Sequence, residues 1–281
     1  MPTSVTPDYL RPRLLHRENE SHKGDYGHLL IVAGCESMPG AAVLATGAAL
    51  KSGCGLVTVH STKRALQAIV NNYPSAMLSE DPRPQFSRVP ASLERYSAIA
   101  VGPGLSRDAL SGVALRNLLS AAKEAGIPMV IDADALNLIS ENPRMMDLIP
   151  HGSIMTPHIG ELRRLVPFEQ GQKEKAAREL ALKSGCVVVL KGFHTRIIAP
   201  DGTCLVNATG NPGMAKGGSG DVLTGLIGGL LARGYAAIDA TALGVWAHGF
   251  AGDRLTEERT AEAWSSKDLI DLLYTGFKTL Y

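Results

Sequence analysis

The chain has 281 residues, of which 45% are hydrophobic and 20% are charged. This is the ordinary balance of a globular protein with a sizeable core. The formal net charge is +1, so no overall field attracts nucleic acid, a membrane surface or an acidic partner. Because no basic run is interleaved with aromatic residues, the sequence also argues against a nucleic-acid-binding protein.

The first twenty residues contain prolines, arginines and acids but no apolar segment, so they do not form a secretory signal. The longest apolar stretch, at residues 222–232, is interrupted by glycine and is too short to span a bilayer. The four cysteines are scattered and form no CxxC pair, so neither a zinc site nor a disulfide framework is indicated. We therefore expect a cytoplasmic protein with reduced thiols.

Apolar runs alternate with amphipathic stretches along the chain, and the pattern predicts the following elements in order. Buried strands are predicted at residues 28–34, 56–61, 98–102, 129–132, 153–156 and 187–190. A hairpin is predicted from 195–199 and 203–206, which flank an Asp-Gly turn. Helices are predicted at residues 41–52, 108–125, 173–184, 221–233, 238–255 and 264–277.

Continuous apolar strands that alternate with helices predict a mostly parallel sheet covered on both faces. No linker, composition shift or repeat divides the sequence. We therefore expect an α/β fold, a three-layer α/β/α sandwich formed as a single domain over residues 1–281. In such sheets ligands bind at the carboxyl ends of the strands, where the unusual polar and glycine-rich clusters of this sequence also lie.

The clearest of these clusters is GNPGMAKGGSGD at residues 210–221. Three glycines in four positions, directly before a predicted helix, allow consecutive backbone N–H groups to point at one anion. The positive end of the helix dipole adds to the attraction. The loop matches neither the Walker A pattern nor the GxGxxG pattern after a strand. It therefore predicts a different kind of phosphate site, with Asp221 at the start of the helix.

A simpler interpretation is a flexible turn in which Asp221 is only a helix N-cap. Two features favour the phosphate site. Pro212 stiffens the approach to the glycines, and the helix carries Gly225, Gly228 and Gly229, each of which weakens a helix by about 1 kcal/mol relative to Ala. That cost suggests that another backbone packs closely against the helix beneath the site.

Two further clusters follow predicted strands. In TPHIGE, at residues 156–161, His158 could orient a substrate and Glu161 could reach a phosphate-bound metal ion; a plain helix start with an early Glu is the alternative. In KGFHT, at residues 191–195, Lys191 could meet phosphate charge. A surface lysine at a strand end is equally compatible with that pattern.

The remaining clusters are VGPG at 101–104 and DADALN at 132–137, together with HKGDYG at 22–27 and MPGAA at 38–42. The paired Asp132 and Asp134 suggest acid–base chemistry or Mg²⁺ held through water, while a helix cap explains Asp134 equally well. The small residues of MPGAA could line a pocket. Three histidines lie outside every cluster and are interpreted as structural: His16, His60 and His248.

Taken in order, HKGDYG, SMPGAAVLA, VGPG, DADALN, TPHIGE, KGFHT and GNPGMAKGGSGD–LTG resemble the ADP/ATP-dependent NAD(P)H-hydrate dehydratases of the ribokinase-like superfamily. The resemblance runs from about Ser21 to the C-terminus. GNPGMAKGGSGD combined with HKGDYG is specific to this family, whereas GSGD alone marks only the wider kinase superfamily. The resemblance implies repair of nicotinamide cofactors hydrated at C6, with the S-epimers of NADHX and NADPHX converted to NADH and NADPH.

The resemblance also implies residue roles. The hydrate is expected to contact Ala42, Gly102, Gly104, His158 and Asp221. The nucleotide is expected to contact Lys191, Gly192, Phe193, His194, Thr195, Gly217, Gly218, Ser219 and Gly220. Asp221 is the expected catalytic residue, accepting the proton of the C6 hydroxyl as this is phosphorylated before elimination. ADP or ATP is the implied phosphoryl donor, with ADP expected for a standalone chain, and Mg²⁺ is expected to contact Glu161 through water.

The chain departs from the family pattern in two places: Ser106 stands where glycine is frequent, and Ile159 where proline is frequent. Only about twenty residues precede the matched region, so epimerase activity is not expected in this chain. A separate NAD(P)HX epimerase is the expected functional partner. Members of the family tend to form homo-oligomers, often tetramers, and we expect the same here.

Two other functions share part of the pattern. A small-molecule kinase of the same superfamily, acting on a sugar, a hydroxymethylpyrimidine or a thiazole alcohol, would use the GSGD loop and Asp221 but has no evident need for HKGDYG together with TPHIGE. A non-catalytic nucleotide sensor would bind AMP or ADP without turnover. A Rossmann oxidoreductase is disfavoured because no GxGxxG follows the first strand.

Overall fold

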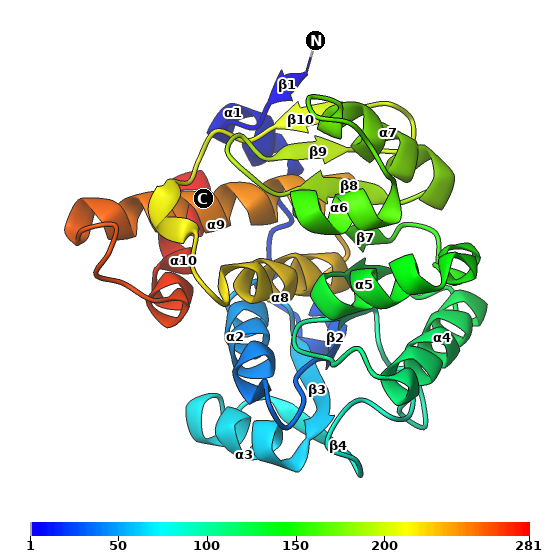
Figure 1. The fold of residues 1–281 in the computed structure, drawn as a ribbon. Coiled ribbons are helices and arrows are strands. Elements are labelled where there is room, and N and C mark those ends of the chain that lie inside the picture. The colour runs from blue at the N-terminus through cyan, green and yellow to red at the C-terminus, as the bar shows by residue number, and fades with distance from the viewer. Residues whose placement is uncertain (1) are drawn as a thin grey trace.

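The computed structural model describes residues 2–281 and contains one ten-stranded sheet in the order β1-β10-β9-β8-β7-β6-β5-β2-β3-β4 (Figure 1). Among the strands of these residues, only β9 runs against its neighbours, and every other pairing is parallel. The strands are β1 (Thr3–Ser4), β2 (His28–Val32), β3 (Leu56–Thr62), β4 (Met77–Asp81), β5 (Ala98–Val101), β6 (Met129–Ile131), β7 (Ile154–Met155), β8 (Val187–Leu190), β9 (Arg196–Ile198) and β10 (Cys204–Val206).

The helices flank this sheet on both faces. They are α1 (Pro7–Leu10), α2 (Pro39–Leu50), α3 (Lys63–Asn72), α4 (Ala109–Glu124), α5 (Ala133–Glu141), α6 (Ile159–Leu165), α7 (Lys173–Ser184), α8 (Ser219–Ala232), α9 (Ala237–Glu258) and α10 (Ser266–Leu280). Short 3₁₀ turns are η1 (Arg11–Arg13), η2 (Lys23–Tyr26), η3 (Pro143–Leu148) and η4 (Pro212–Met214).

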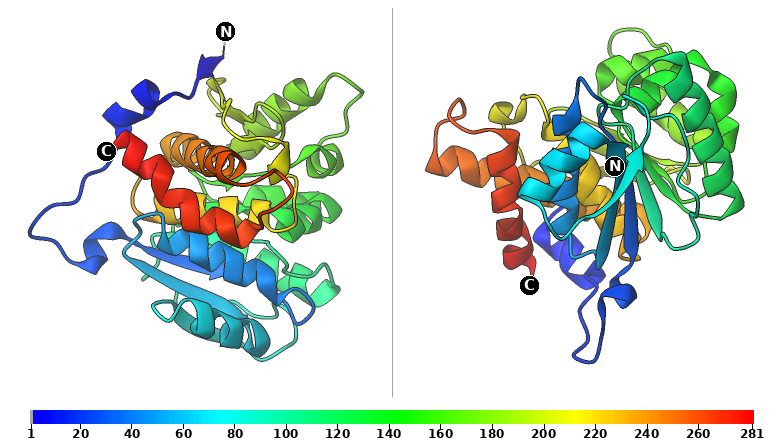
Figure 2. Two further views of the ribbon diagram at one scale, coloured as in Figure 1. Left: turned by 90° about the vertical axis from the view of Figure 1, so that its left-hand side faces the viewer. Right: turned by 90° about the horizontal axis from the view of Figure 1, so that it is seen from below.

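Two hydrophobic cores lie on opposite faces of the sheet because successive strand side chains point in opposite directions. In β5, Ala98 and Ala100 belong to the core under α2, α3, α8, α9 and α10, while Ile99 and Val101 belong to the core under α4, α5, α6 and α7. Figure 2 shows α2, α8, α9 and α10 packed side by side on the first face. The predicted three-layer α/β fold with a mostly parallel sheet is therefore confirmed.

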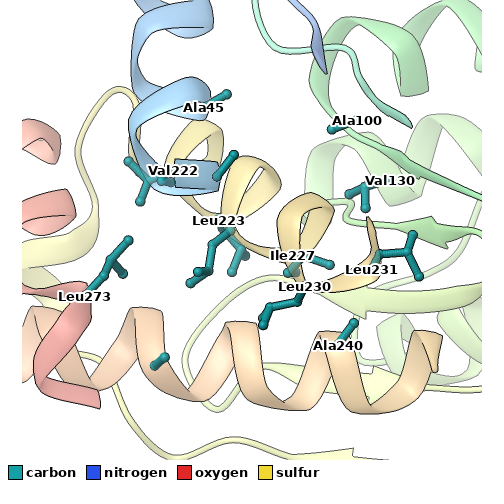
Figure 3. Close-up of a cluster of buried hydrophobic side chains, with 14 of the residues drawn as sticks. Ala45, Ala100, Val130, Val222, Leu223, Ile227, Leu230, Leu231, Ala240 and Leu273 are labelled. Carbon is teal, nitrogen blue, oxygen red and sulfur yellow. The ribbon is translucent and has the colours of Figure 1, made fainter. Parts of the chain in front are cut away.

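Helix α8 lies at the centre of the first core, between α2, α9 and the sheet (Figure 3). It is buried on nearly all sides, which explains its lack of an amphipathic pattern. A methyl group on Gly225 would collide with the carbonyl of Ala45, and one on Gly229 would collide with the side chain of Ser52. The glycines of α8 thus let α2 approach backbone to backbone, as the sequence predicts.

Most predicted elements agree with the structure to within a few residues, including the hairpin of β9 and β10. The structure confirms a helix (α6) opening at TPHIGE and adds β1, α1, α3 and α5, and it adds β4 at the edge of the sheet. Met77 and Leu78 of β4 are exposed, so this strand lacks the continuous apolar signal of the buried ones. Within residues 2–281, no helix is both long and apolar enough to cross a membrane.

Candidate active site

The glycine-rich loop leads into α8 at the carboxyl ends of the central strands. A side-chain carbon on Gly220 would lie 3.5 Å from Lys191 Nζ, which follows β8, and 3.7 Å from Asp132 Oδ2, which follows β6. The first turn of α8 therefore lies directly over the ends of these two strands. This brings Gly217–Gly220, Asp221 and Lys191 together, although they are separated in the sequence.

The helix begins after Gly218, which has a φ of 89°, a left-handed conformation that favours glycine. No side chain of residues 2–281 caps this helix, so its first N–H groups are not occupied by a cap. Asp221 lies within the first turn rather than at the N-cap position. The interpretation of Asp221 as an N-cap is therefore wrong, and a free helix N-terminus of this kind suits an anion.

The loop before α8 is held by the segment between α9 and α10 and by the first residue of α10, and it is not a flexible turn. Lys216 donates hydrogen bonds to the carbonyls of Ala261 and Trp264 at 2.6 and 2.7 Å, and its ammonium lies 4.1 Å from the centre of the Trp264 ring. Ser266 donates to the carbonyl of Gly217 at 2.7 Å. The amides of the glycine-rich segment are thus held in place before any ligand arrives.

A buried carboxylate joins three elements beneath this loop. Asp132 accepts a hydrogen bond from Lys191 Nζ at 2.7 Å and another from Thr224 of α8 at 2.7 Å. Lys191 Nζ also lies 3.8 Å from Glu161 Oε2. The interpretation of Lys191 as a surface lysine is therefore wrong. Asp132 was recognised in the sequence only as part of an Asp pair, because the partners that give it this role are distant in the chain.

The electrostatics of the cluster favour a proton acceptor at Asp221. Burial, and then the negative charge of Asp132, raise the pKa of Asp221 to about 6, although Lys191 partly opposes the shift. Burial also raises the pKa of Glu161. For Lys191, burial lowers the pKa, but the carboxylates of Asp132 and Glu161 outweigh it and leave the pKa above its ordinary value. The lysine therefore stays charged beside the carboxylates.

His158 is the N-cap of α6. Its Nδ1 accepts hydrogen bonds from the amides of Gly160 and Glu161, and Glu161 accepts one in return from the His158 amide at 2.8 Å. The interpretation of TPHIGE as a helix start is therefore correct, and Nδ1 of His158 is used to cap that helix. The other ring nitrogen, Nε2, lies 3.3 Å from Glu161 Oε1, and the side chain is 53% exposed. One face of His158 therefore remains accessible to a ligand.

A small pocket opens beside the segment that follows β8. It is lined by Lys173, Glu174, Leu190, Lys191, Gly192, Phe193, His194 and Arg196. Phe193 is 84% exposed and stacks on His194 with ring centres 4.0 Å apart. His194 has a φ of 56°, a strained value for a residue other than glycine. An exposed aromatic pair next to Lys191 is suited to a nucleotide.

The predicted hydrate side is formed by the loops after β2 and β5. A methyl group on Gly104 would lie 2.9 Å from Ala41 Cβ and 3.0 Å from the Met38 carbonyl, so the two loops touch. Ala42 and Gly102 are buried behind this contact. A direct contact between either residue and the hydrate would require the loops to move, and that part of the site stays a prediction.

Ser106 has a φ of 76°, so a residue other than glycine here occupies a conformation that favours glycine. Its amide donates to Asp134 Oδ2 at 3.1 Å, which holds the loop after β5 against the start of α5. The side chain of Asp134 therefore fixes a loop rather than capping its own helix. That Ser in place of the frequent glycine makes this loop less free stays a prediction.

A mostly parallel sheet between two helix layers, with a glycine-rich loop leading into a buried helix at the strands' carboxyl ends, defines the ribokinase-like class of α/β protein, which similar solved structures share. The chain belongs to the NAD(P)H-hydrate dehydratase family, whose model matches residues 29–274.

Three similar proteins illustrate the relationship. An ADP-dependent (S)-NAD(P)H-hydrate dehydratase of Bacillus subtilis is 37% identical over 272 residues, which cover 95% of each chain. A bifunctional NAD(P)H-hydrate repair enzyme of Moorella thermoacetica is 39% identical over 96% of this chain, which spans only 52% of that longer protein. The crystal structure of a B. subtilis ADP/ATP-dependent NAD(P)H-hydrate dehydratase, co-crystallised with ATP and Mg²⁺, has a TM-score of 0.86, 33% identity and 99% coverage of both chains.

Proposed function

We propose that this protein is an ADP-dependent dehydratase that converts the S-epimers of NADHX and NADPHX back to NADH and NADPH. The observation that carries the proposal is the position of Asp221, a half-buried carboxylate with a raised pKa in the first turn of α8, beside the glycine-rich anion site and Lys191. Family membership and the similarity to the B. subtilis dehydratase support the substrate.

Chemically, hydroxide is a poor leaving group, so phosphorylation of the hydrate's C6 hydroxyl makes elimination easier. Asp221 accepts the proton of the C6 hydroxyl while the hydroxyl oxygen attacks the terminal phosphorus of ADP. The bond between that phosphorus and the bridging oxygen breaks, and AMP leaves. The ring nitrogen then pushes out phosphate from C6, a proton leaves C5, and the dihydronicotinamide ring is restored.

The protein supplies position and charge for the phosphoryl transfer. The amides of Gly217–Gly220 and the start of α8 face the phosphoryl oxygens, and Lys191 adds a positive charge held in place by Asp132. The rest of the nucleotide contacts the segment after β8, at Gly192, Phe193, His194 and Thr195. His158 and Gly104 contact the hydrate on the opposite side of Asp221.

The charges of the site fit Mg²⁺ bound through the nucleotide. The carboxylates of Asp132, Glu161 and Asp221 share one ammonium, that of Lys191, which leaves excess negative charge. Residues 2–281 contain no group of three acidic, His or Cys side chains arranged to hold a metal by themselves. Mg²⁺ usually binds through phosphates, water and one or two carboxylates. Glu161 is the residue that would hold it through water, and the bound ion would neutralise charge on the phosphates.

The test follows absorbance at 340 nm with purified protein, mixed NADPHX epimers, Mg²⁺, and either ADP or ATP. We expect a rise that requires nucleotide, is faster with ADP, and stops when the S-epimer is consumed. Phosphate and AMP should appear in equal amounts. No rise with either nucleotide would refute the proposal. A stable phosphorylated product would instead indicate a small-molecule kinase, which shares the loop and Asp221.

Three expectations concern the protein's surroundings. A separate NAD(P)HX epimerase would convert the R-epimer to the substrate of this chain. A homo-oligomer, with four subunits in the expected form, and a cytoplasmic location both stay predictions. Size-exclusion chromatography with light scattering measures the number of subunits.

A further inference from the structure

A buried carboxylate that the proposed chemistry does not use lies at the edge of the sheet. Asp81 ends the edge strand β4 and is 2% exposed, whereas its neighbour Glu80 is exposed. It accepts hydrogen bonds from the amides of Arg83, Ser87 and Arg88 at 3.0, 2.8 and 3.3 Å. One carboxylate therefore organises the whole loop that follows it, which we call the Asp81 loop (residues 82–88).

The buried carboxylate is fully partnered. Ser87 Oγ donates to it at 2.5 Å, and His60 Nε2 from β3 lies 3.2 Å away. Burial alone would raise the pKa of Asp81, but the hydrogen bonds from His60 and Ser87 outweigh burial and hold the pKa well below its usual range. The other nitrogen of His60 bonds Ser79 at 2.9 Å, and Phe86 packs edge-on against its ring. The folded protein therefore stabilises the charged form of Asp81.

The Asp81 loop contacts both loops of the predicted hydrate side. The amide of Glu36, in the loop after β2, donates to the Pro84 carbonyl at 2.7 Å. Ser111 Oγ donates to the carbonyls of Phe86 and Leu105 at 3.2 and 3.3 Å, which joins the Asp81 loop to the loop after β5. The loops after β2 and β5 are the two that meet at Gly104.

We propose that the Asp81 loop is a buttress for the hydrate side of the active site, and that Asp81 and His60 are positioning residues for hydrate binding. The inference rests on the proposed function. The nucleotide side follows β8, which is separated from β4 by five strands of the sheet. Release of the loop therefore weakens hydrate binding and leaves nucleotide binding unchanged.

The test compares Asp81→Asn with the wild type and with the control Asp201→Asn. Asp201 also accepts an amide hydrogen bond in a loop, from Thr203, but in the hairpin at the other side of the sheet. Asp81→Asn removes the charge and replaces one accepting oxygen by an amide group that only donates, so we expect the KM for the hydrate to rise about tenfold. The kcat and the KM for ADP should stay within about twofold of the wild type.

A second measurement needs no substrate. Trypsin cleaves poorly at Arg83 because Pro84 follows it, but Arg88 is followed by Val89. The Arg88 amide donates to Asp81, and its guanidinium donates to the Glu80 carbonyl at 3.3 Å. We expect cleavage after Arg88 to be about tenfold faster in Asp81→Asn, in proportion to the population of the open loop. Should Asp81→Asn fail to fold, Ser87→Ala removes a single hydrogen bond and should raise the hydrate KM about threefold.

The outcomes separate the two proposals. Absence of turnover in the wild type would count against the proposed function itself. Wild-type turnover combined with an unchanged hydrate KM in a variant whose Arg88 is cleaved faster would overturn the buttress alone. Equal rises in the KM values for hydrate and ADP would also overturn it, because they would indicate general destabilisation.

Discussion

The ammonium of Lys191 lies 2.7 Å from the buried carboxylate of Asp132, and this contact joins the ends of β8 and β6 beneath the first turn of α8. Thr224 ties the same carboxylate to α8 itself. The pair therefore fixes a positive charge next to the anion site and a negative charge near Asp221. In the proposed mechanism, this one buried ion pair serves both the phosphate and the proton acceptor.

Replacement of the proton acceptor tests its role directly. Asp221→Asn keeps the shape of the side chain but cannot accept the hydroxyl proton, so we expect turnover to fall by about 10²–10⁴-fold. The affinity for ADP, measured by calorimetry, should change by less than about threefold, since the amides of Gly217–Gly220 are intact. Asp239→Asn, in the first turn of α9, serves as the control with unchanged turnover. Undiminished turnover of Asp221→Asn would remove it from the mechanism.

The pH dependence of the reaction follows from the same carboxylate. Asp221 must be deprotonated to act, and burial and Asp132 raise its pKa to about 6. We therefore expect kcat/KM to fall about tenfold per pH unit below this value. In Asp132→Asn the neighbouring negative charge is lost, so the acidic limb should move to lower pH. Profiles of kcat/KM for both proteins check this, and an acidic limb at the same pH in both would contradict the coupling.

The sequence predicted the fold, and it singled out the loops at the carboxyl ends of the strands, because their signals are local. Apolar strands, the glycines before α8 and the glycines within it can be read from neighbouring residues. The contacts of Asp132 with Lys191 and Thr224 could not be predicted in this way, because these two residues lie 59 and 92 positions from Asp132 along the chain. His60 was interpreted as structural because it lies in no motif. Its pairing with Asp81 became visible only once β3 and β4 were side by side.

Close packing of α8 on α2 predicts how the fold responds to one added methyl group. Gly225→Ala improves helix propensity, but the methyl group collides with the Ala45 carbonyl, so we expect a net loss of about 1–3 kcal/mol in the free energy of unfolding. In the control Gly112→Ala, on α4, the added methyl group makes an ordinary 3.6 Å contact with Leu138 and should stabilise by up to about 1 kcal/mol. Urea denaturation measures both. Equal effects of the two substitutions would show that helix propensity alone decides the change in the free energy of unfolding.

Stability at acidic pH should depend on His248, which supports the start of α8 from below. Its Nε2 lies 2.9 Å from the Ser219 carbonyl, to which it donates as the neutral ring. Burial, helped by the charge of Lys191 and opposed by this hydrogen bond, lowers the pKa of His248 from 6.5 to about 4. As the pH falls below 6.5, the unfolded chain gains a proton that the folded chain does not, so folding becomes less favourable until pH reaches about 4.

The shift corresponds to about 3 kcal/mol of unfolding free energy lost across this pH range. His248→Gln keeps an N–H donor for Ser219 but does not titrate. We therefore expect the variant to lose less stability than the wild type between pH 6.5 and 4, with the two curves parallel above pH 7. Because His28 is also buried with a lowered pKa, the comparison uses the difference between the two proteins, measured by urea denaturation at each pH. Identical slopes below pH 6.5 would mean that His248 is protonated as readily in the folded protein as in the unfolded chain.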